Sequence, residues 1–223
     1  MFNIWEKPHF PPPSEAGPDG LLITGGSLAP AWMMEAYKSG IFPMPLHYEN
    51  ERTLGWFSPD PRGILELDAL HVSRRLARRL RRGEFQFTMN AAFSQVVEAC
   101  AAPRPQDTGC WLTLAMQNAY LALHQLGAAH SVEVWSEGVL VGGVFGIAIG
   151  GLFAGESMFS RRTDGSKAAL AFLVNHLRKR GFALLDVQWT NEHTRSLGAV
   201  DISRDDYLRL LASAISLPAS FAG

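Results

Sequence analysis

Three consecutive runs with strand patterning, joined by two tight turns, constrain this chain more than any other feature of its sequence. The runs occupy residues 131–137, 139–149 and 152–160, and the turns fall at Glu137-Gly138 and Gly150-Gly151. Glycine in a short connection favours a hairpin, because it adopts positive φ at little steric cost. The pattern therefore predicts three antiparallel strands that follow one another in one sheet.

A helix and a further strand are expected after these three strands. Ser166 is a candidate N-cap for the helix, and Gly181 suits its end. One face of this helix is apolar at Leu170, Leu173, Val174 and Leu177. Residues 182–189 then have strand character, and a final helix begins at Ser203. A strand–helix–strand crossover beside a meander predicts an α+β fold with a mainly antiparallel sheet.

The first half of the chain contains more helical than strand patterning. Ser27 and Asn90 are candidate N-caps there, and Gly40 and Gly127 suit the ends of helices. The expected elements are helices after Ser27, over 70–82, after Asn90 and over 114–126, with a short strand at 85–88.

The N-terminal residues predict a separate small domain. Residues 1–20 hold five of the 13 prolines, which disfavours a continuous helix or a central strand and favours an extended surface arm. Residues 54–63 are rich in turn formers, so we expect a boundary near Arg62. The predicted division is a small N-terminal domain at 1–62 and a main domain at 63–223.

Composition excludes several classes of protein. The chain has 223 residues, 47% of them apolar, and a net charge of −1, so it can bury a core and does not bind nucleic acid through overall charge. Two cysteines cannot form a disulfide framework. No apolar run reaches 18 residues, and the N-terminus lacks a signal-peptide pattern, so a cytoplasmic protein is expected. The seven histidines show no metal-ligand spacing.

A run of arginines is the first candidate for a functional surface. Residues 74–82 read RRLARRLRR, so Arg74, Arg75, Arg78, Arg79, Arg81 and Arg82 surround a narrow apolar stripe. Like charges this close on a helix repel each other. An anionic partner, with a nucleic-acid backbone the obvious example, would make use of them. The alternative is a solvated face, for which only Asp68 and Glu84 lie nearby in the sequence.

Two strands carry polar residues among apolar ones. Alternation places Glu156, Met158 and Ser160 on one face of the third strand. It also places Asp186 and Gln188 on one face of the strand at 182–189. If the two strands are neighbours, Glu156, Asp186 and Gln188 converge, which would suit an amine-bearing substrate. A structural polar cluster remains the alternative.

Several of these segments together resemble one family. The matching segments include WFSPDPRGIL, LFAGESMFS, LLDVQWTNEHTRSLGA and SRDDYL, and they extend from Gly20 to about Leu211. On these motifs the chain resembles the bacterial leucyl/phenylalanyl-tRNA–protein transferases. The resemblance implies a small N-terminal domain followed by a domain like the acyl-CoA N-acyltransferases (GNAT-like). It also implies transfer of Leu, Phe or, less well, Met from aminoacyl-tRNA to proteins with N-terminal Arg or Lys, which marks them for degradation under the N-end rule.

The resemblance also implies roles for particular residues. Asp186 and Gln188 would be catalytic and orient the reacting amine, and Glu156 would bind the acceptor. The donor aminoacyl-adenosine pocket would be formed by Trp111, Val144, Met158, Leu170 and Leu185. The arginines of 74–82 would contact the tRNA backbone. No metal, no dissociable cofactor and no membrane are implied.

The chain departs from the family pattern at four positions: Met44, Leu114, Ala115 and Val144. The first three concern adenosine and tRNA contacts, and Val144 replaces a longer Met in the pocket. Two other functions remain as alternatives, an acetyl-CoA-dependent N-acetyltransferase and a non-catalytic tRNA-binding module. The loop at 162–167 has Arg162 and Gly165 of the acetyl-CoA motif, but Lys167 fills its last small-residue position.

Overall fold

A computed structural model describes residues 8–48, 51–103 and 111–222. The first seven residues of the predicted proline-rich arm lie outside these ranges. The described part of the arm contains a short 3-10 helix at Pro13–Glu15. Phe10 packs against Trp32 and Trp56, with ring centroids 5.5 and 5.0 Å away. The arm is therefore fixed to the domain by an aromatic contact.

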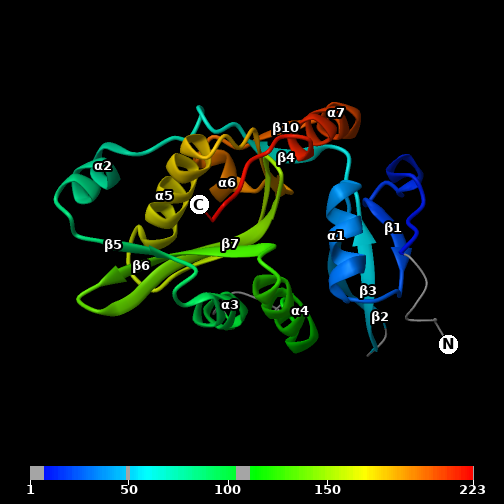
Figure 1. The fold of residues 1–223 in the computed structure, drawn as a ribbon, viewed down its shortest axis with the longest axis horizontal. Helices are drawn as coiled ribbons and strands as arrows, with labels where there is room; N and C mark the ends of the chain where they lie inside the picture. The colour runs from blue at the N-terminus through cyan, green and yellow to red at the C-terminus, as the bar shows by residue number, and fades with distance from the viewer. Residues whose placement is uncertain (1–7, 49–50, 104–110, 223) are drawn as a thin grey trace.

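The described strands form two sheets, which lie side by side along the long axis of the molecule (Figure 1). The smaller sheet has the order β1-β3-β2 and packs against helix α1. Its elements are β1 (Leu21–Thr24), α1 (Pro30–Lys38), β2 (Phe42–Tyr48) and β3 (Glu51–Phe57). Both of its strand pairs are antiparallel.

The larger sheet has seven strands in the order β10-β4-β9-β8-β7-β6-β5. Its strands are β4 (Arg62–Leu65), β5 (Gln86–Met89), β6 (Ala129–Ser136), β7 (Val139–Ile149), β8 (Leu152–Ser160), β9 (Leu184–Gln188) and β10 (Val200–Ile202). The strands β6, β7 and β8 are the predicted meander. β8 and β9 are the one parallel pair in this sheet, and helix α5 connects them. The predicted α+β fold with a mainly antiparallel sheet is confirmed, and this crossover is the arrangement expected of an N-acyltransferase-like domain.

Helices cover both faces of the larger sheet (Figure 1). Helices α3 and α4 pack on one face, and α5 packs on the other. Helix α2 contacts α5 at the end of the molecule far from the small sheet. The helices are α2 (Arg74–Arg81), α3 (Phe93–Ala101), α4 (Leu114–Gln125), α5 (Gly165–Lys179), α6 (Glu192–Ser196) and α7 (Arg204–Ile215).

The small sheet and the larger sheet share a hydrophobic core. Met33 of α1 and Trp56 of β3 belong to the same buried cluster as Phe93, Tyr120 and Phe145. A second cluster lies between the sheet and α5. Arg62, at the predicted boundary, begins β4 in the larger sheet. The division of the chain into two domains at this residue stays a prediction.

Three predicted helix caps are wrong. Ala29, not Ser27, is the N-cap of α1, although the Ser27 hydroxyl accepts a hydrogen bond from the Ala29 N–H. Asn90 has a positive φ of 59°, and its side chain instead bonds to β6, where Oδ1 accepts from the Ser131 N–H. Asp164, not Ser166, precedes α5. Asn and Asp adopt positive φ more readily than other non-glycine residues, which sequence periodicity does not reveal.

Four predicted helix termini are confirmed, those at Gly40, Gly127, Gly181 and Ser203, and one helix is shorter than predicted. Gly40 follows α1 with φ of 76°, and Ser203 caps α7 by accepting from the Asp206 N–H. Helix α2 begins at Arg74 rather than residue 70, because Ser73 caps it. In the described ranges no helix combines the length and the apolar character needed to cross a membrane.

Candidate active site

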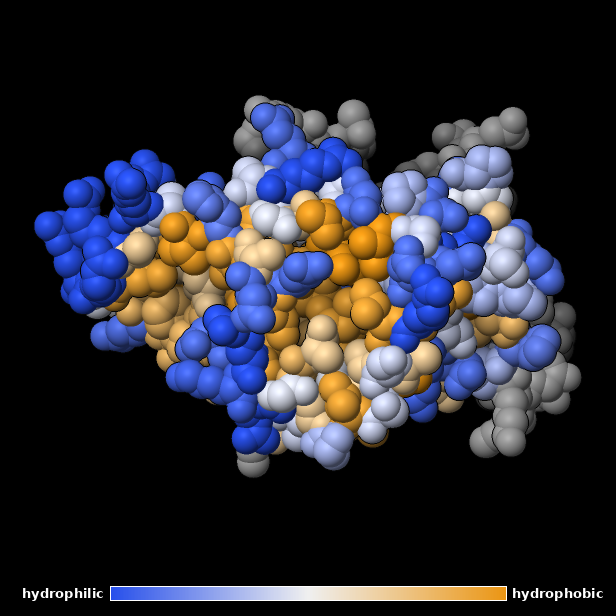
Figure 2. Space-filling view, turned by 90° about the horizontal axis from the view of Figure 1, so that it is seen from above, coloured by the Kyte–Doolittle hydropathy of each residue, from blue (hydrophilic) through white to orange (hydrophobic). Residues whose placement is uncertain are grey.

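A cavity of about 650 Å³ opens between the larger sheet and helices α5 and α6. Figure 2 shows apolar side chains gathered around a hollow in this face of the molecule. The five predicted donor-pocket residues all line the cavity: Trp111, Val144, Met158, Leu170 and Leu185. Glu156 and Gln188 line it as well. The structure thus brings the apolar and polar candidates to one site, and their individual roles stay predictions.

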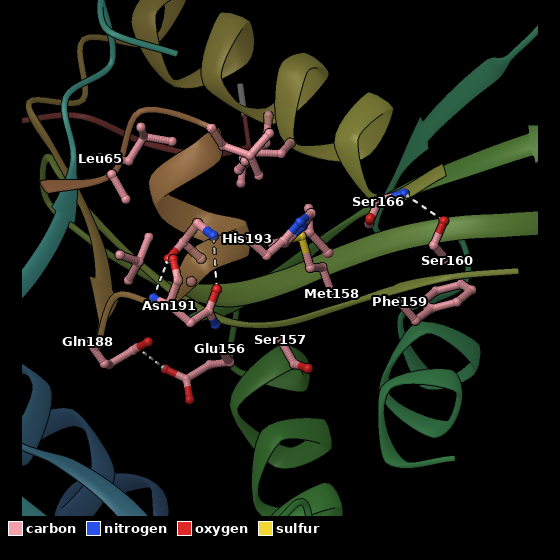
Figure 3. A pocket seen from close by; sticks show the side chains of 18 of the residues that line it. Leu65, Glu156, Ser157, Met158, Phe159, Ser160, Ser166, Gln188, Asn191 and His193 are labelled. Carbon is pink, nitrogen blue, oxygen red and sulfur yellow. Dashed lines mark hydrogen bonds between the residues drawn. The ribbon is translucent and has the colours of Figure 1, made fainter. Parts of the chain in front are cut away.

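Glu156 and Gln188 form the polar end of this cavity (Figure 3). The Gln188 Nε2 atom donates to Glu156 Oε1 over 3.3 Å. The Tyr120 hydroxyl donates to Glu156 Oε2 over 2.6 Å, and it lies 3.1 Å from the Tyr37 hydroxyl. Tyr120 comes from α4 and Tyr37 from α1. Both the small N-terminal unit and the main sheet therefore fix the position of this carboxylate.

A β-bulge places Glu156 on a different face of β8 from Met158. Phe145 pairs with Ser157 and Gly146 pairs with Gly155, so Glu156 is an extra residue in its strand. Glu156 points to Tyr120 on α4, whereas Met158 packs in the cluster below α5. The prediction that Glu156 and Met158 share a face is wrong, because simple alternation fails across a bulge. Both residues still reach the cavity.

Asp186 lies behind Gln188 rather than in the cavity wall. Its carboxylate accepts from Arg62 Nε over 2.9 Å and from Arg62 Nη2 over 2.6 Å. It also accepts from the Tyr207 hydroxyl over 2.8 Å and from the Gln188 N–H over 2.9 Å. Asp186 and Arg62 are each 1% exposed. The predicted convergence of the three residues is present, and Asp186 contacts the site through the Gln188 N–H, while its catalytic role stays a prediction.

The backbone of Gln188 is held in an unusual conformation. Its φ is 58°, in the left-handed region, and its N–H is held by the Asp186 carboxylate. A side chain other than glycine rarely adopts this conformation, and such residues cluster at functional sites. The buried Arg62–Asp186 pair therefore positions the amide that touches Glu156.

Glu156 has a perturbed acidity. Burial raises its pKa from 4.5 to about 7, and the nearby Asp186 charge adds to the rise. Hydrogen bonds from Tyr120 and Tyr37 act in the opposite direction. A carboxyl group with this pKa exchanges its proton near neutral pH, which is typical of functional sites.

Several residues of the site were not among the predicted ones. Tyr37, Arg62, Tyr120 and Tyr207 support Glu156 and Asp186, and His193 lines the cavity (Figure 3). Helical periodicity places Tyr120 on the buried face of its helix, but it does not show which partner its hydroxyl meets. The sequence does signal that Asp186, an acid on an apolar strand, needs a cationic or hydrogen-bonding partner, but it does not identify Arg62 as that partner.

The arginines of α2 divide into exposed and paired groups. Arg79 is bound by Glu84 at 2.8 Å and by Asp164 at 2.9 Å, and its guanidinium lies over the Phe85 ring. Arg75 also pairs with Asp164 but is largely exposed. Arg74, Arg78, Arg81 and Arg82 are exposed and form no ion pair with the residues that the structure describes. Arg79 is thus engaged by two carboxylates of the protein itself, and its role in an anion-binding surface stays a prediction.

Gly165 in the loop before α5 has a structural explanation. A Cβ at this position would lie 2.6 Å from the Val141 carbonyl oxygen, and a Cβ at Gly142 would lie 2.5 Å from the Gly165 carbonyl carbon. The two glycines therefore allow α5 to approach β7 closely. No group of three potential metal ligands occurs among the described His, Cys, Asp and Glu residues.

The fold and the site together define an α+β acyltransferase-like protein, with an apolar cavity that ends at a carboxylate–amide pair. Sequence models described as "Leucyl/phenylalanyl-tRNA protein transferase" and as its N-terminal domain match residues 64–212 and 26–60. The chain belongs to this family, and it is an aminoacyltransferase. The predicted family and enzyme class are therefore confirmed.

Two curated relatives agree with this assignment. A leucyl/phenylalanyl-tRNA–protein transferase of Alkalilimnicola ehrlichii is 50% identical over 212 residues, covering 94% of this chain and 81% of the relative. One of Stutzerimonas stutzeri is 47% identical over 213 residues, covering 95% and 93%. Among solved structures, a GCN5-related N-acetyltransferase from Kribbella flavida aligns with a TM-score of 0.40 and 13% identity, over 75% of this chain and 58% of that one.

Proposed function

We propose that this enzyme transfers Leu, Phe or, less well, Met from aminoacyl-tRNA to the α-amino group of proteins that begin with Arg or Lys. The product would be marked for degradation under the N-end rule, and the reaction would take place in the cytoplasm. The observation that carries the proposal is the cavity, with apolar walls for a donor side chain and the Glu156–Gln188 pair at one end for an amine. An apolar cavity with a few convergent polar groups is typical of a small-ligand site.

The reaction needs positioning more than acid–base chemistry. The neutral α-amine attacks the carbonyl carbon of the aminoacyl ester, the ester C–O bond breaks, and the tRNA leaves with its ribose hydroxyl restored by the proton that the amine gives up. A free α-amino group has a pKa of about 7.7–8.0, so roughly a tenth is neutral at pH 7. Gln188 accepts a hydrogen bond from the amine and orients it, and Glu156 pairs with the acceptor's positive charge. Holding both reactants in attack geometry supplies several kcal/mol.

One assay tests this proposal against its alternative. Leu-, Phe- and Met-tRNA are each incubated with a peptide that begins with Arg and with a matched peptide that begins with Ala. We expect transfer to the Arg peptide and little to the Ala peptide. A parallel reaction supplies acetyl-CoA in place of aminoacyl-tRNA. Acetylation of the Arg peptide, without aminoacyl transfer, would overturn the proposal in favour of an N-acetyltransferase.

The exposed arginines of α2 provide the first mutational prediction. Replacing Arg74, Arg78, Arg81 and Arg82 with Ala should weaken tRNA binding and flatten its salt dependence. We expect the log–log slope to fall by roughly 0.7–0.9 for each phosphate contact that is lost. The measurement is the dissociation constant for aminoacyl-tRNA at several salt concentrations. A control variant replaces two exposed arginines outside α2, Arg178 and Arg209, and its slope should equal that of the wild type. An unchanged slope in the α2 variant would remove the tRNA assignment.

Val144 provides a prediction about donor choice. It pairs with Met158 across β7 and β8, and both line the cavity beside Leu170. Val is shorter than the Met expected from the family, so we expect Phe or Met to be used at least as well as Leu. Val144→Met should shift the preference toward Leu by about 1–3 kcal/mol. The measurement is kcat/KM for Leu-, Phe- and Met-tRNA with one Arg peptide. Val139→Met, at an exposed position of the same strand, serves as the control, and equal shifts in both variants would place residue 144 outside the pocket.

A further inference from the structure

An aromatic side chain stands at the polar end of the cavity without a role in the site as described so far. Trp189 lines the cavity directly after Gln188, and it is 38% exposed. A large apolar side chain is normally buried. The exposed part of the Trp189 ring adjoins the cavity, and exposed apolar surface of this kind often marks a binding site.

The ring of Trp189 is held in place by the small N-terminal unit. Phe42 of β2 contacts it with ring centroids 4.8 Å apart and an interplanar angle of 86°. Phe57 of β3 contacts it at 5.6 Å and 69°. These edge-to-face contacts fix the ring and leave part of it open toward the cavity. A rigid, partly exposed indole is a prepared surface for a ligand.

The same part of the molecule already binds one arginine, Arg62, between a carboxylate and two aromatic rings. The Arg62 guanidinium pairs with the Asp186 carboxylate, and it lies 4.7 Å from the Phe42 ring centroid and 4.3 Å from that of Tyr207. A carboxylate at the edge of a guanidinium and aromatic rings on its faces satisfy both its charge and its planar surface. Glu156 and Trp189 present the same pair of chemical groups to the open cavity, since Glu156 bonds to Gln188 and Trp189 follows Gln188 in the chain.

We propose that Trp189 binds the cationic side chain of the acceptor's first residue through a cation–π contact, and that it shares this cation with Glu156. The inference rests on the proposed function and adds an acceptor-recognising residue to it. Among protein side chains, Trp provides the strongest cation–π surface.

The position of Trp189 favours the acceptor over the donor tRNA. Its neighbours Phe42 and Phe57 belong to the small sheet, which lies at the opposite end of the molecule from α2 (Figure 1). The proposed tRNA contacts are on α2, which is joined to the loop before α5 by the Arg79–Asp164 ion pair. Ser160 and Arg161, at the start of that loop, line the cavity. The acceptor would therefore enter from the end of the cavity that Trp189 occupies.

A charge-specific comparison tests the proposal. Peptides that begin with Arg or with citrulline, its uncharged isostere, are compared as acceptors for wild type, Trp189→Leu and Trp189→Phe. We expect Trp189→Leu to raise the KM for the Arg peptide by about 3- to 30-fold and to lower the Arg:citrulline ratio of kcat/KM. Trp189→Phe, which keeps an aromatic face, should retain part of that ratio. The KM for aminoacyl-tRNA should not change in either variant.

Each other outcome overturns the inference in a distinct way. If Trp189→Leu weakens both peptides equally, Trp189 supports the site only by packing. If the KM for aminoacyl-tRNA rises instead, the indole stacks on the donor's adenosine. If wild type transfers to the Arg peptide and Trp189→Leu is indistinguishable from it, only the inference about Trp189 fails. If wild type transfers to no peptide, the proposed function itself fails.

Discussion

Replacing Glu156 with Gln should lower kcat/KM for an Arg peptide by about 30-fold or more, while the KM for aminoacyl-tRNA changes little. The carboxylate loses its charge but the residue keeps its size and can still bond to Tyr120. Losing one partner of a buried charge pair costs about 2–5 kcal/mol, which corresponds to this loss or more. The measurement is steady-state kinetics with acceptor and donor varied separately. Glu137→Gln, at an exposed turn residue, is the matched control and should behave as wild type.

The same variant should change the pH dependence of activity. Burial raises the pKa of Glu156 to about 7, so wild type loses its acceptor-binding charge as the pH falls through 7. The α-amino group of the peptide also becomes neutral as the pH rises, in both proteins alike. The ratio of wild-type to Glu156→Gln activity isolates the carboxylate, and it should rise with pH around 7. A constant ratio from pH 6 to pH 8 would show that the charge of Glu156 is not used.

Stability should move in the opposite direction from activity. The folded-state pKa of Glu156 lies above the unfolded value of 4.5, so its contribution to stability is greatest below pH 4.5 and is lost as the pH rises through about 7. A Gln side chain stays uncharged at every pH, so it does not bear the cost of burying a negative charge. Relative to wild type, Glu156→Gln should therefore gain stability between these pH values, by up to about 3 kcal/mol. A variant that is less active and more stable at pH 8 identifies a residue kept for function.

Asp186→Ala should destabilise the fold by about 3–5 kcal/mol, because it leaves the Arg62 guanidinium buried without its counter-charge. Tyr207 and the Gln188 N–H would lose an acceptor as well. The measurement is the free energy of unfolding from denaturant titration. Asp201→Ala breaks a more exposed pair with Arg195 and should cost less than about 1 kcal/mol.

A double variant tests whether the loss of stability in Asp186→Ala comes from the unpaired charge of Arg62 or from the lost side-chain volume. Arg62→Met with Asp186→Leu removes both charges, and replacing a whole buried ion pair by apolar residues is often neutral or better for stability. We expect it to be more stable than Asp186→Ala alone, while Gln188 loses the carboxylate that holds its N–H, so that activity stays low. If Asp186→Ala were as stable as wild type, the buried pair would not support the fold.

The sequence predicts this fold well where periodicity decides the structure. The meander at 131–160 and helix α5 follow from alternation and from the spacing of Leu170, Leu173 and Leu177, since the pattern and the buried face coincide. Prediction fails where one residue breaks the period. The bulge at Glu156 separates it from Met158, and Asn90 and Asp164 adopt positive φ instead of the roles assigned by capping patterns.

The residues that meet at the candidate site could be predicted from the sequence, but the contacts that hold them in place could not. The expected pairing of the two strands brought Glu156, Asp186 and Gln188 together, as the structure has them. The sequence pattern does not show that Asp186 pairs with Arg62, because this contact joins two strands that are distant in the sequence. For the same reason the sequence does not reveal Asp164 as the partner of Arg79, since the two residues lie 85 positions apart.

The place of β4 in the sheet bears on how the chain folds during synthesis. β4 lies between β9 and β10, and Arg62 meets Asp186 across 124 positions of sequence. At about 5–20 residues per second, a ribosome takes roughly 6–25 s to supply that partner. Throughout this interval Arg62 of the nascent chain lacks the Asp186 carboxylate with which it is buried in the folded protein. The seven-stranded sheet is therefore completed only after its C-terminal strands β9 and β10 have been synthesised. The Gln188 conformation, which depends on Asp186, forms in the same late step.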